Sequence, residues 1–231
     1  MPVVEERSTV TEAPRGAHVP RQRGERLAEA AAWYAEERRW DVVAGTRLDM
    51  VDGSERCSCG RADCAWPGAH PAGPHWAGEA TGGAAAARRM WDRQPGASVL
   101  LPAGRAFDAL DVPESAGFLA LARMERMGLP AGPVTRTPDR RTVFLVAPGG
   151  AAKAPVLVRS LGWDAGAIGL VGRGEGHYVV APPTRVGGRG AVQWARPPGR
   201  TDHRLPDVQE LIGPLAYACA REASDARSRL S

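Results

Sequence analysis

Apolar and polar residues follow two different spacings along the chain, and together these spacings predict a mixed α/β (α+β) fold. Helical spacing, with apolar residues three and four positions apart, occurs at 23–39, 83–92, 115–127 and 206–223. Short apolar runs bounded by proline or glycine predict strands at 99–101, 106–112, 142–146 and 178–181. A hairpin is predicted over 132–148, a loop at 147–155 and a short strand at 156–160.

Composition places the expected boundaries around one large domain. Residues 1–22 are polar and interrupted by prolines, which predicts a disordered N-terminal arm. We expect the domain to cover 23–195, a linker rich in proline and arginine to cover 196–206, and a C-terminal helix and tail to cover 207–231. The full length of 231 residues is enough to bury a core.

The charge of the chain changes this picture little. The formal net charge is +4, but of 30 basic residues only Lys153 is a lysine. Alanine, glycine and proline are also abundant, so the arginine content is typical of GC-rich coding and does not by itself indicate nucleic acid. The sequence has no apolar run near 18 residues and no apolar core of a signal peptide, so we expect a cytoplasmic protein without a membrane partner.

A cluster of cysteines in residues 57–75 predicts a metal loop. Cys57, Cys59, Cys64 and His70 form the pattern C-x-C-x4-C-x5-H, which supplies a sufficient ligand set for tetrahedral structural zinc. Four protein ligands would close the site, so a catalytic zinc is not expected. Two points stay open: His75 competes with His70 as the fourth ligand, and the cysteines are alternatively free or redox-active.

The strand predicted at 106–112 contains two carboxylates, Asp108 and Asp111. A carboxylate in a buried strand is unfavourable unless it is paired, hydrogen-bonded or bound to a metal. Side chains alternate along a strand, so these two aspartates are expected to point to opposite faces.

Two stretches resemble the bifunctional primase–polymerase (prim-pol) branch of the archaeo-eukaryotic primases. Residues 97–117 match its first active-site motif, a glycine turn and an apolar strand that ends in Asp-x-Asp, and 168–184 match its run Arg-Gly-x-Gly before Tyr-Val-Val-Ala-Pro-Pro. The similarity extends over about 27–194 and includes the cysteine loop, which ends in GAHP at 68–71. The resemblance implies an archaeo-eukaryotic primase-like fold, with an α/β module packed on an RRM-like sheet and the active site between them.

The chain departs from this family at the positions that carry the chemistry. Active members hold two divalent ions on three aspartates, and a histidine contacts nucleotide phosphates. Asp111 falls on the first aspartate, whereas Pro113 and Val171 stand at the other two and Thr142 stands at the histidine.

Three functions therefore remain open. The first is a degenerate prim-pol domain that binds single-stranded DNA or a nucleotide, for which the candidate residues are Arg105, Arg141, Arg173 and His177. The second is an active primase–polymerase that uses Mg²⁺ or Mn²⁺ on Asp108, Asp111 and Glu114. The third is a non-enzymatic interaction or regulatory protein whose partner the sequence does not identify. If binding survives, the three candidate arginines should converge on one cleft.

Overall fold

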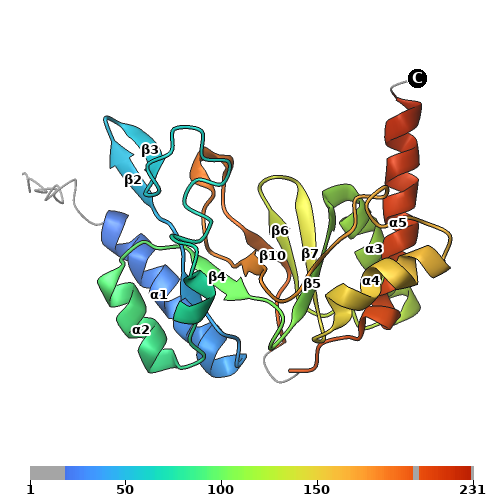
Figure 1. The fold of residues 1–231 in the computed structure, drawn as a ribbon, viewed down its shortest axis with the longest axis horizontal. Coiled ribbons are helices and arrows are strands. Elements are labelled where there is room, and N and C mark those ends of the chain that lie inside the picture. The colour runs from blue at the N-terminus through green and yellow to red at the C-terminus, as the bar shows by residue number, and fades with distance from the viewer. Residues whose placement is uncertain (1–18, 200–202, 230–231) are drawn as a thin grey trace, which may run out of the picture.

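The computed structural model describes residues 19–199 and 203–229, and in this part of the chain it shows helices packed on antiparallel sheets (Figure 1). The predicted mixed α/β class is confirmed. The first 18 residues of the predicted N-terminal arm lie outside the described residues. Among the described helices, none is long and apolar enough to cross a membrane.

A three-stranded antiparallel sheet combines two strands of the N-terminal half with one strand from the C-terminal half. Its strand order is β1 (Val43–Ala44), β4 (Val99–Pro102), β9 (Tyr178–Val180). Two helices pack beside it, α1 (Val19–Glu37) and α2 (Ala84–Arg93). Buried residues of α1, α2 and β4 form one core with Ala109, Val143 and Leu145, which belong to the second sheet. The two sheets therefore share a continuous interior.

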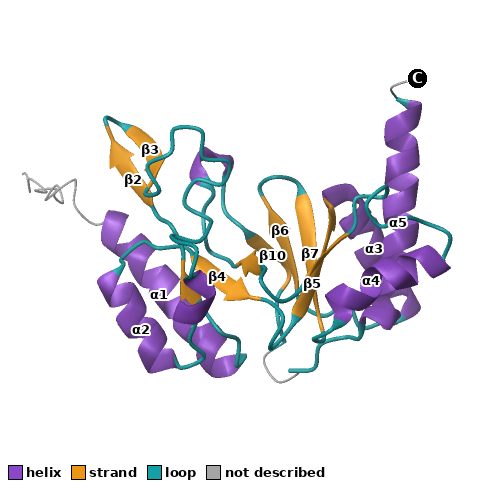
Figure 2. Cartoon of the chain, viewed as in Figure 1, coloured by secondary structure: helices purple, strands orange, loops and turns teal. Residues whose placement is uncertain are grey.

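The C-terminal half is built on a five-stranded antiparallel sheet. Its strand order is β10 (Gln193–Arg196), β6 (Val134–Thr137), β7 (Arg141–Val146), β5 (Asp108–Pro113), β8 (Val171–Arg173). Three helices cover one face, α3 (Glu114–Met127), α4 (Gly150–Ser160) and α5 (Val208–Ser228) (Figure 2). The opposite face of the sheet, on which Asp111 lies, does not pack against these three helices.

A small hairpin, β2 (Leu48–Val51) and β3 (Ser54–Cys57), carries the chain into the cysteine loop. The cysteine loop continues into the short helix η1 (Trp76–Glu79). A second short helix, η2 (Gly187–Arg189), lies beside the cysteine loop. Backbone bonds fasten the loop: Thr46 N–H donates to the His70 carbonyl at 2.8 Å, and Gly187 N–H donates to the Pro67 carbonyl at 3.0 Å.

The loop predicted at 147–155 and the strand predicted at 156–160 are wrong, because this segment forms α4. Ala154 and Val158, four residues apart, are buried, whereas Val156 between them is exposed. That spacing is helical, although the apolar run itself is typical of a strand. Pro155 lies inside the helix, as Pro214 does in α5.

The helices at both ends differ in length from the prediction. Helix α1 begins at Val19, four residues before the expected start, and α5 continues to Ser228. Asp207 caps α5 by accepting from Gln209 N–H at 2.9 Å, and Glu210 completes a capping box. The domain boundaries inferred from composition stay predictions.

Candidate functional site

Asp111 lies on β5, the strand next to the edge strand β8 of the five-stranded sheet, and is held by two arginines. Its side chain is 4% exposed, and its two oxygens face different guanidinium groups. Arg141 Nε donates to Oδ1 at 2.7 Å, and Arg173 Nε donates to Oδ2 at 2.8 Å, with a further contact from Arg173 Nη2. Arg141 also donates to the carbonyls of Asp111 and Gly169. The charges of Asp111, Arg141 and Arg173 sum to +1. The Asp139 carboxylate, which lines the cavity beside this cluster, lowers the sum to zero.

Strand register explains why these three residues meet. On β5, Leu110 and Val112 face the helices, so Ala109 and Asp111 face the other side. The antiparallel pairing places Pro113 opposite Arg141 on β7, and Ala109 opposite Arg173 on β8. Each arginine therefore starts two positions from Asp111 along the partner strand and reaches it diagonally.

A cavity of about 110 Å³ opens beside this cluster. It takes walls from both sheets and from the cysteine loop; the lining residues are Trp66, Ala69, Asp111, Thr137, Asp139, Arg141, Val143, Arg173, Tyr178, Val179 and Val180. We call it the Asp111 cavity. Its polar groups include two carboxylates, two guanidinium groups and two hydroxyls.

Asp139 and Thr137 line the cavity but are not among the site residues predicted from the sequence. Asp139 lies in the turn between β6 and β7, and its carboxylate accepts from the Thr137 hydroxyl. That turn belongs to the hairpin predicted over 132–148, and a turn aspartate is ordinarily exposed. The register of the β6–β7 hairpin places Asp139 at the cavity, and no short sequence motif predicts this position.

Asp108 lies on the face opposite Asp111, as the alternation predicts. Its Oδ2 accepts from Ala151 N–H at 2.9 Å, at the beginning of α4. Helix N-termini favour negative charge, so this contact fixes α4 on the sheet. Its Oδ1 has no hydrogen-bond partner among the described residues.

Glu114 is the first residue of α3, directly after the end of β5. Its carboxylate pairs with Arg136 at 3.3 Å and with Arg140 at 3.6 Å. The structure therefore does not gather Asp108, Asp111 and Glu114 into one ligand set.

Thr142 faces the helices, whereas Arg141 and Val143, on either side of it along β7, line the cavity. Thr142 is fully buried against Gly117 of α3. A Cβ at Gly117 would lie 2.5 Å from the Thr142 Cβ, so α3 packs here at glycine distance. A histidine side chain at position 142 would have to enter the packed layer beneath α3.

Two of the three predicted arginines converge on the Asp111 cavity, and the third does not. Arg105 is 81% exposed and pairs with Asp41 at 2.9 Å. His177 is exposed in the turn before β9, where its ring contacts the Glu175 carbonyl. Neither lines the cavity.

The structure brings Cys57, Cys59, Cys64 and His70 together, with ligand atoms that all lie within 4.8 Å of one another. His70 Nε2 lies 3.3 Å from Cys57 Sγ and 3.4 Å from Cys64 Sγ. Among the described residues this is the one group of three or more metal-ligating side chains of this kind, and His75 is outside it. The cluster could hold a metal ion.

The surroundings of the cluster fit a metal. His70 Nδ1 lies 2.8 Å from the Pro71 carbonyl, which favours the proton on Nδ1 and leaves the Nε2 lone pair toward the thiols. Burial raises the pKa of Cys57, but hydrogen bonds from the backbone of Cys59 and Gly68 outweigh it and lower the pKa to about 6. Burial and the neighbouring thiols raise the pKa of Cys64 to about 11. One thiolate is therefore favoured at neutral pH before any ion binds.

The match to a family model agrees with the motifs. The family model described as "Bifunctional DNA primase/polymerase, N-terminal" matches residues 31–209. A search of curated proteins finds no match. Among solved structures, the polymerase domain from Mycobacterium tuberculosis Ligase D in complex with DNA is similar at 15% identity and a TM-score of 0.36, over 96% of each chain. On the family match, which spans most of its length, the chain belongs to the Prim-Pol family of bifunctional DNA primase/polymerase N-terminal domains.

Proposed function

We propose that this prim-pol domain binds phosphate groups of single-stranded DNA or of a nucleotide at the Asp111 cavity, and does not polymerise. One observation carries the proposal: both oxygens of Asp111 are occupied by the guanidinium groups of Arg141 and Arg173. A carboxylate paired in this way neutralises part of an anion site instead of presenting free oxygens to a cation.

The geometry around Asp111 supports the loss of metal chemistry. Two-metal phosphoryl transfer needs several carboxylates that hold both ions. Val171 is paired directly with Asp111 across the sheet and is 45% exposed, so an acidic side chain there would stand beside Asp111. Valine and Pro113 supply no oxygen ligand. Asp108 and Glu114 are engaged elsewhere, which disfavours the alternative of an active enzyme with Mg²⁺ or Mn²⁺.

The two arginines are suited to phosphate. A guanidinium group carries five N–H donors in a planar fork, and Asp111 uses only some of them. Arg141 and Arg173 are both partly exposed, so an entering phosphate reaches them from the cavity. The small volume fits a phosphate group and leaves the rest of a nucleotide or strand outside.

We further propose that the cysteine cluster binds zinc as a closed, structural site. Three thiolates and one imidazole are a common zinc set. Trp66 and Ala69 of the same loop line the Asp111 cavity, so zinc would fix one of its walls.

The binding proposal predicts that Arg173→Ala weakens single-stranded DNA about tenfold, the usual scale for one charged hydrogen bond. Because phosphate contacts carry no base information, the loss should be similar for all sequences, and the slope of log affinity against log salt should fall by about 0.7. Fluorescence anisotropy with labelled oligonucleotides over a salt series measures both. Arg105→Ala is the matched control, since it removes an arginine outside the cavity. Equal effects of the two variants would contradict the proposed site and favour an interaction protein.

The catalytic proposal predicts no primer synthesis or extension above background with Mg²⁺, and at most a trace with Mn²⁺. A primer-extension assay beside an Asp111→Ala protein checks this. Robust extension that disappears in Asp111→Ala would show that Asp111 binds metal after all.

A further inference from the structure

A cavity of about 300 Å³ lies between the end of α1 and the β10 edge of the five-stranded sheet, and it shares no lining residue with the Asp111 cavity. Three arginines line it: Arg38 directly follows α1, Arg196 ends β10, and Arg204 belongs to the connection between β10 and α5. Every other described residue of the lining is a proline or a glycine. We call this space the three-arginine cavity.

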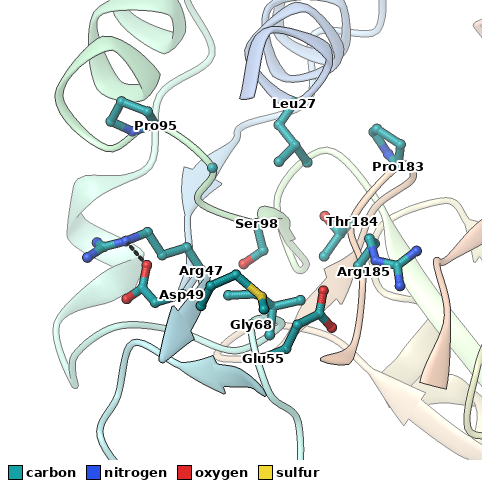
Figure 3. A pocket seen from close by; sticks show the side chains of 13 residues that line it. Leu27, Arg47, Asp49, Glu55, Gly68, Pro95, Ser98, Pro183, Thr184 and Arg185 are labelled. Carbon is teal, nitrogen blue, oxygen red and sulfur yellow. Dashed lines mark hydrogen bonds and ion pairs between the residues drawn. The ribbon is translucent and has the colours of Figure 1, made fainter. Parts of the chain in front are cut away.

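The charge of this cavity differs from that of the other cavities. The larger cavity in Figure 3, of about 450 Å³, is lined by Arg47 and Arg185. Asp49 and Glu55 also line it, so its formal charges balance, as they do in the Asp111 cavity. The three-arginine cavity has no acidic side chain among its described lining residues, and its formal charge is +3. Like charges around one hollow repel one another, and an entering anion relieves that repulsion.

Backbone contacts fix the walls of the three-arginine cavity on the core. The Pro133 carbonyl accepts from Leu145 N–H at 3.0 Å, and the Pro206 carbonyl accepts from Ala147 N–H at 2.9 Å. A Cβ at Gly132 would lie 2.7 Å from Pro206 Cδ, so the two connections touch at glycine distance. Because proline also fixes its own φ, these walls keep their shape before a ligand enters.

The three arginines differ in mobility. Arg38 is 5% exposed, its guanidinium carbon lies 5.2 Å from the centre of the Trp40 ring, and its Nη1 donates to the Gly199 carbonyl at 2.7 Å. Arg196 and Arg204 are exposed. Arg38 therefore supplies a fixed positive charge, whereas the two exposed guanidinium groups can turn their planar forks of N–H donors toward an oxyanion.

We propose that the three-arginine cavity binds a chain of phosphate groups as a second anion site. Arg196 and Arg204 donate to the phosphate oxygens, and the charge of Arg38 strengthens the attraction. The cavity is larger than the Asp111 cavity, at about 300 Å³ against about 110 Å³, so more than one phosphate group can enter. Free polyphosphates and the backbone of single-stranded DNA share this chemistry. The site does not depend on the phosphate site proposed at Asp111.

Isothermal titration calorimetry with inorganic tripolyphosphate tests the site in the full chain that carries Arg173→Ala, because this change weakens the Asp111 cavity. Tripolyphosphate should still bind, and a second change, Arg196→Ala or Arg204→Ala, should lower its affinity about tenfold. Arg159→Ala is the matched control, since Arg159 is an exposed arginine of α4 outside the lining. Tripolyphosphate should also raise the melting temperature less after Arg196→Ala than after Arg159→Ala.

An oligothymidylate strand, measured by fluorescence anisotropy on the same proteins, identifies the source of the phosphates. A tenfold loss in Arg196→Ala, with a salt slope lower by about 0.7, would place the strand backbone in the cavity. A loss confined to tripolyphosphate would identify free polyphosphates. The proposal is overturned if Arg196→Ala and Arg204→Ala bind both probes like Arg159→Ala. Failure of the Asp111 site would show differently, as an Arg173→Ala protein that binds the strand like the wild type.

Discussion

Alanine at His70 is expected to abolish zinc binding and to destabilise the protein strongly, whereas alanine at His75 is expected to do neither. The wild type should carry about one zinc per chain when purified without chelator. Metal binding at such a site contributes directly to folding, and an ion at a thousand times its dissociation constant contributes about 4 kcal/mol. For a domain of this size that corresponds to a loss of about 10 °C in melting temperature.

The two histidines make a matched pair because they differ in position and not in chemistry. His70 Nε2 lies within 3.4 Å of two thiols, and His75 is exposed outside the cluster. Metal analysis and thermal unfolding of both variants measure the effect, with Cys59→Ser as an independent ligand variant. Zinc that survives His70→Ala and is lost in His75→Ala would show that the fourth ligand is His75. Wild-type protein without zinc would contradict the metal site itself.

Much of the ligand set at the cysteine loop could be predicted from sequence because its members are close along the chain. The spacing C-x-C-x4-C-x5-H limits the choice to a few residues. The choice between His70 and His75 depends on the path of the loop, which the Thr46–His70 backbone bond and the docking on η2 fix. Those contacts join segments that are distant in sequence.

The Asp111 cavity could be predicted only in part for the same reason. Alternation on β5 separates Asp108 from Asp111 without further information. Which residue of the hairpin faces the cavity depends on the register between β5 and β7, and a shift by one residue would exchange Arg141 for Thr142. The family pattern points to Thr142, whereas the register brings Arg141 to the Asp111 carboxylate.

Helix α4 shows where local pattern misleads. Pro155 and the apolar residues that follow it are typical of a loop and a strand, and only tertiary burial of Ala154 and Val158 reveals the helix. The error affects function, because the beginning of α4 engages Asp108. The predicted loop and strand would leave Asp108 without this backbone partner and therefore open to a metal ion.

Asp111→Asn is expected to tighten phosphate and DNA binding while it destabilises the free protein, a combination that a metal-ligand role would not produce. Asparagine keeps the shape of the side chain but removes the negative charge between Arg141 and Arg173. Breaking a buried charge pair by neutralising one partner typically costs about 3–5 kcal/mol. Because both arginines are partly exposed, we expect a loss of about 3 kcal/mol. The same change frees both guanidinium groups, so affinity for single-stranded DNA should rise about tenfold.

Added inorganic phosphate gives a second measurement on this variant, because a phosphate anion in the cavity can replace the missing carboxylate. The melting temperature of Asp111→Asn should therefore rise with added phosphate more than that of the wild type. Asp41→Asn is the matched control: its partner Arg105 is an exposed arginine at a similar distance of 2.9 Å, so the loss should stay below about 1 kcal/mol without rescue by phosphate. If Asp111→Asn instead loses DNA binding and Mn²⁺-dependent extension together, Asp111 is a metal ligand and the domain is an enzyme. A gain in affinity with phosphate rescue would establish that Asp111 now acts as the internal counter-ion of an anion site.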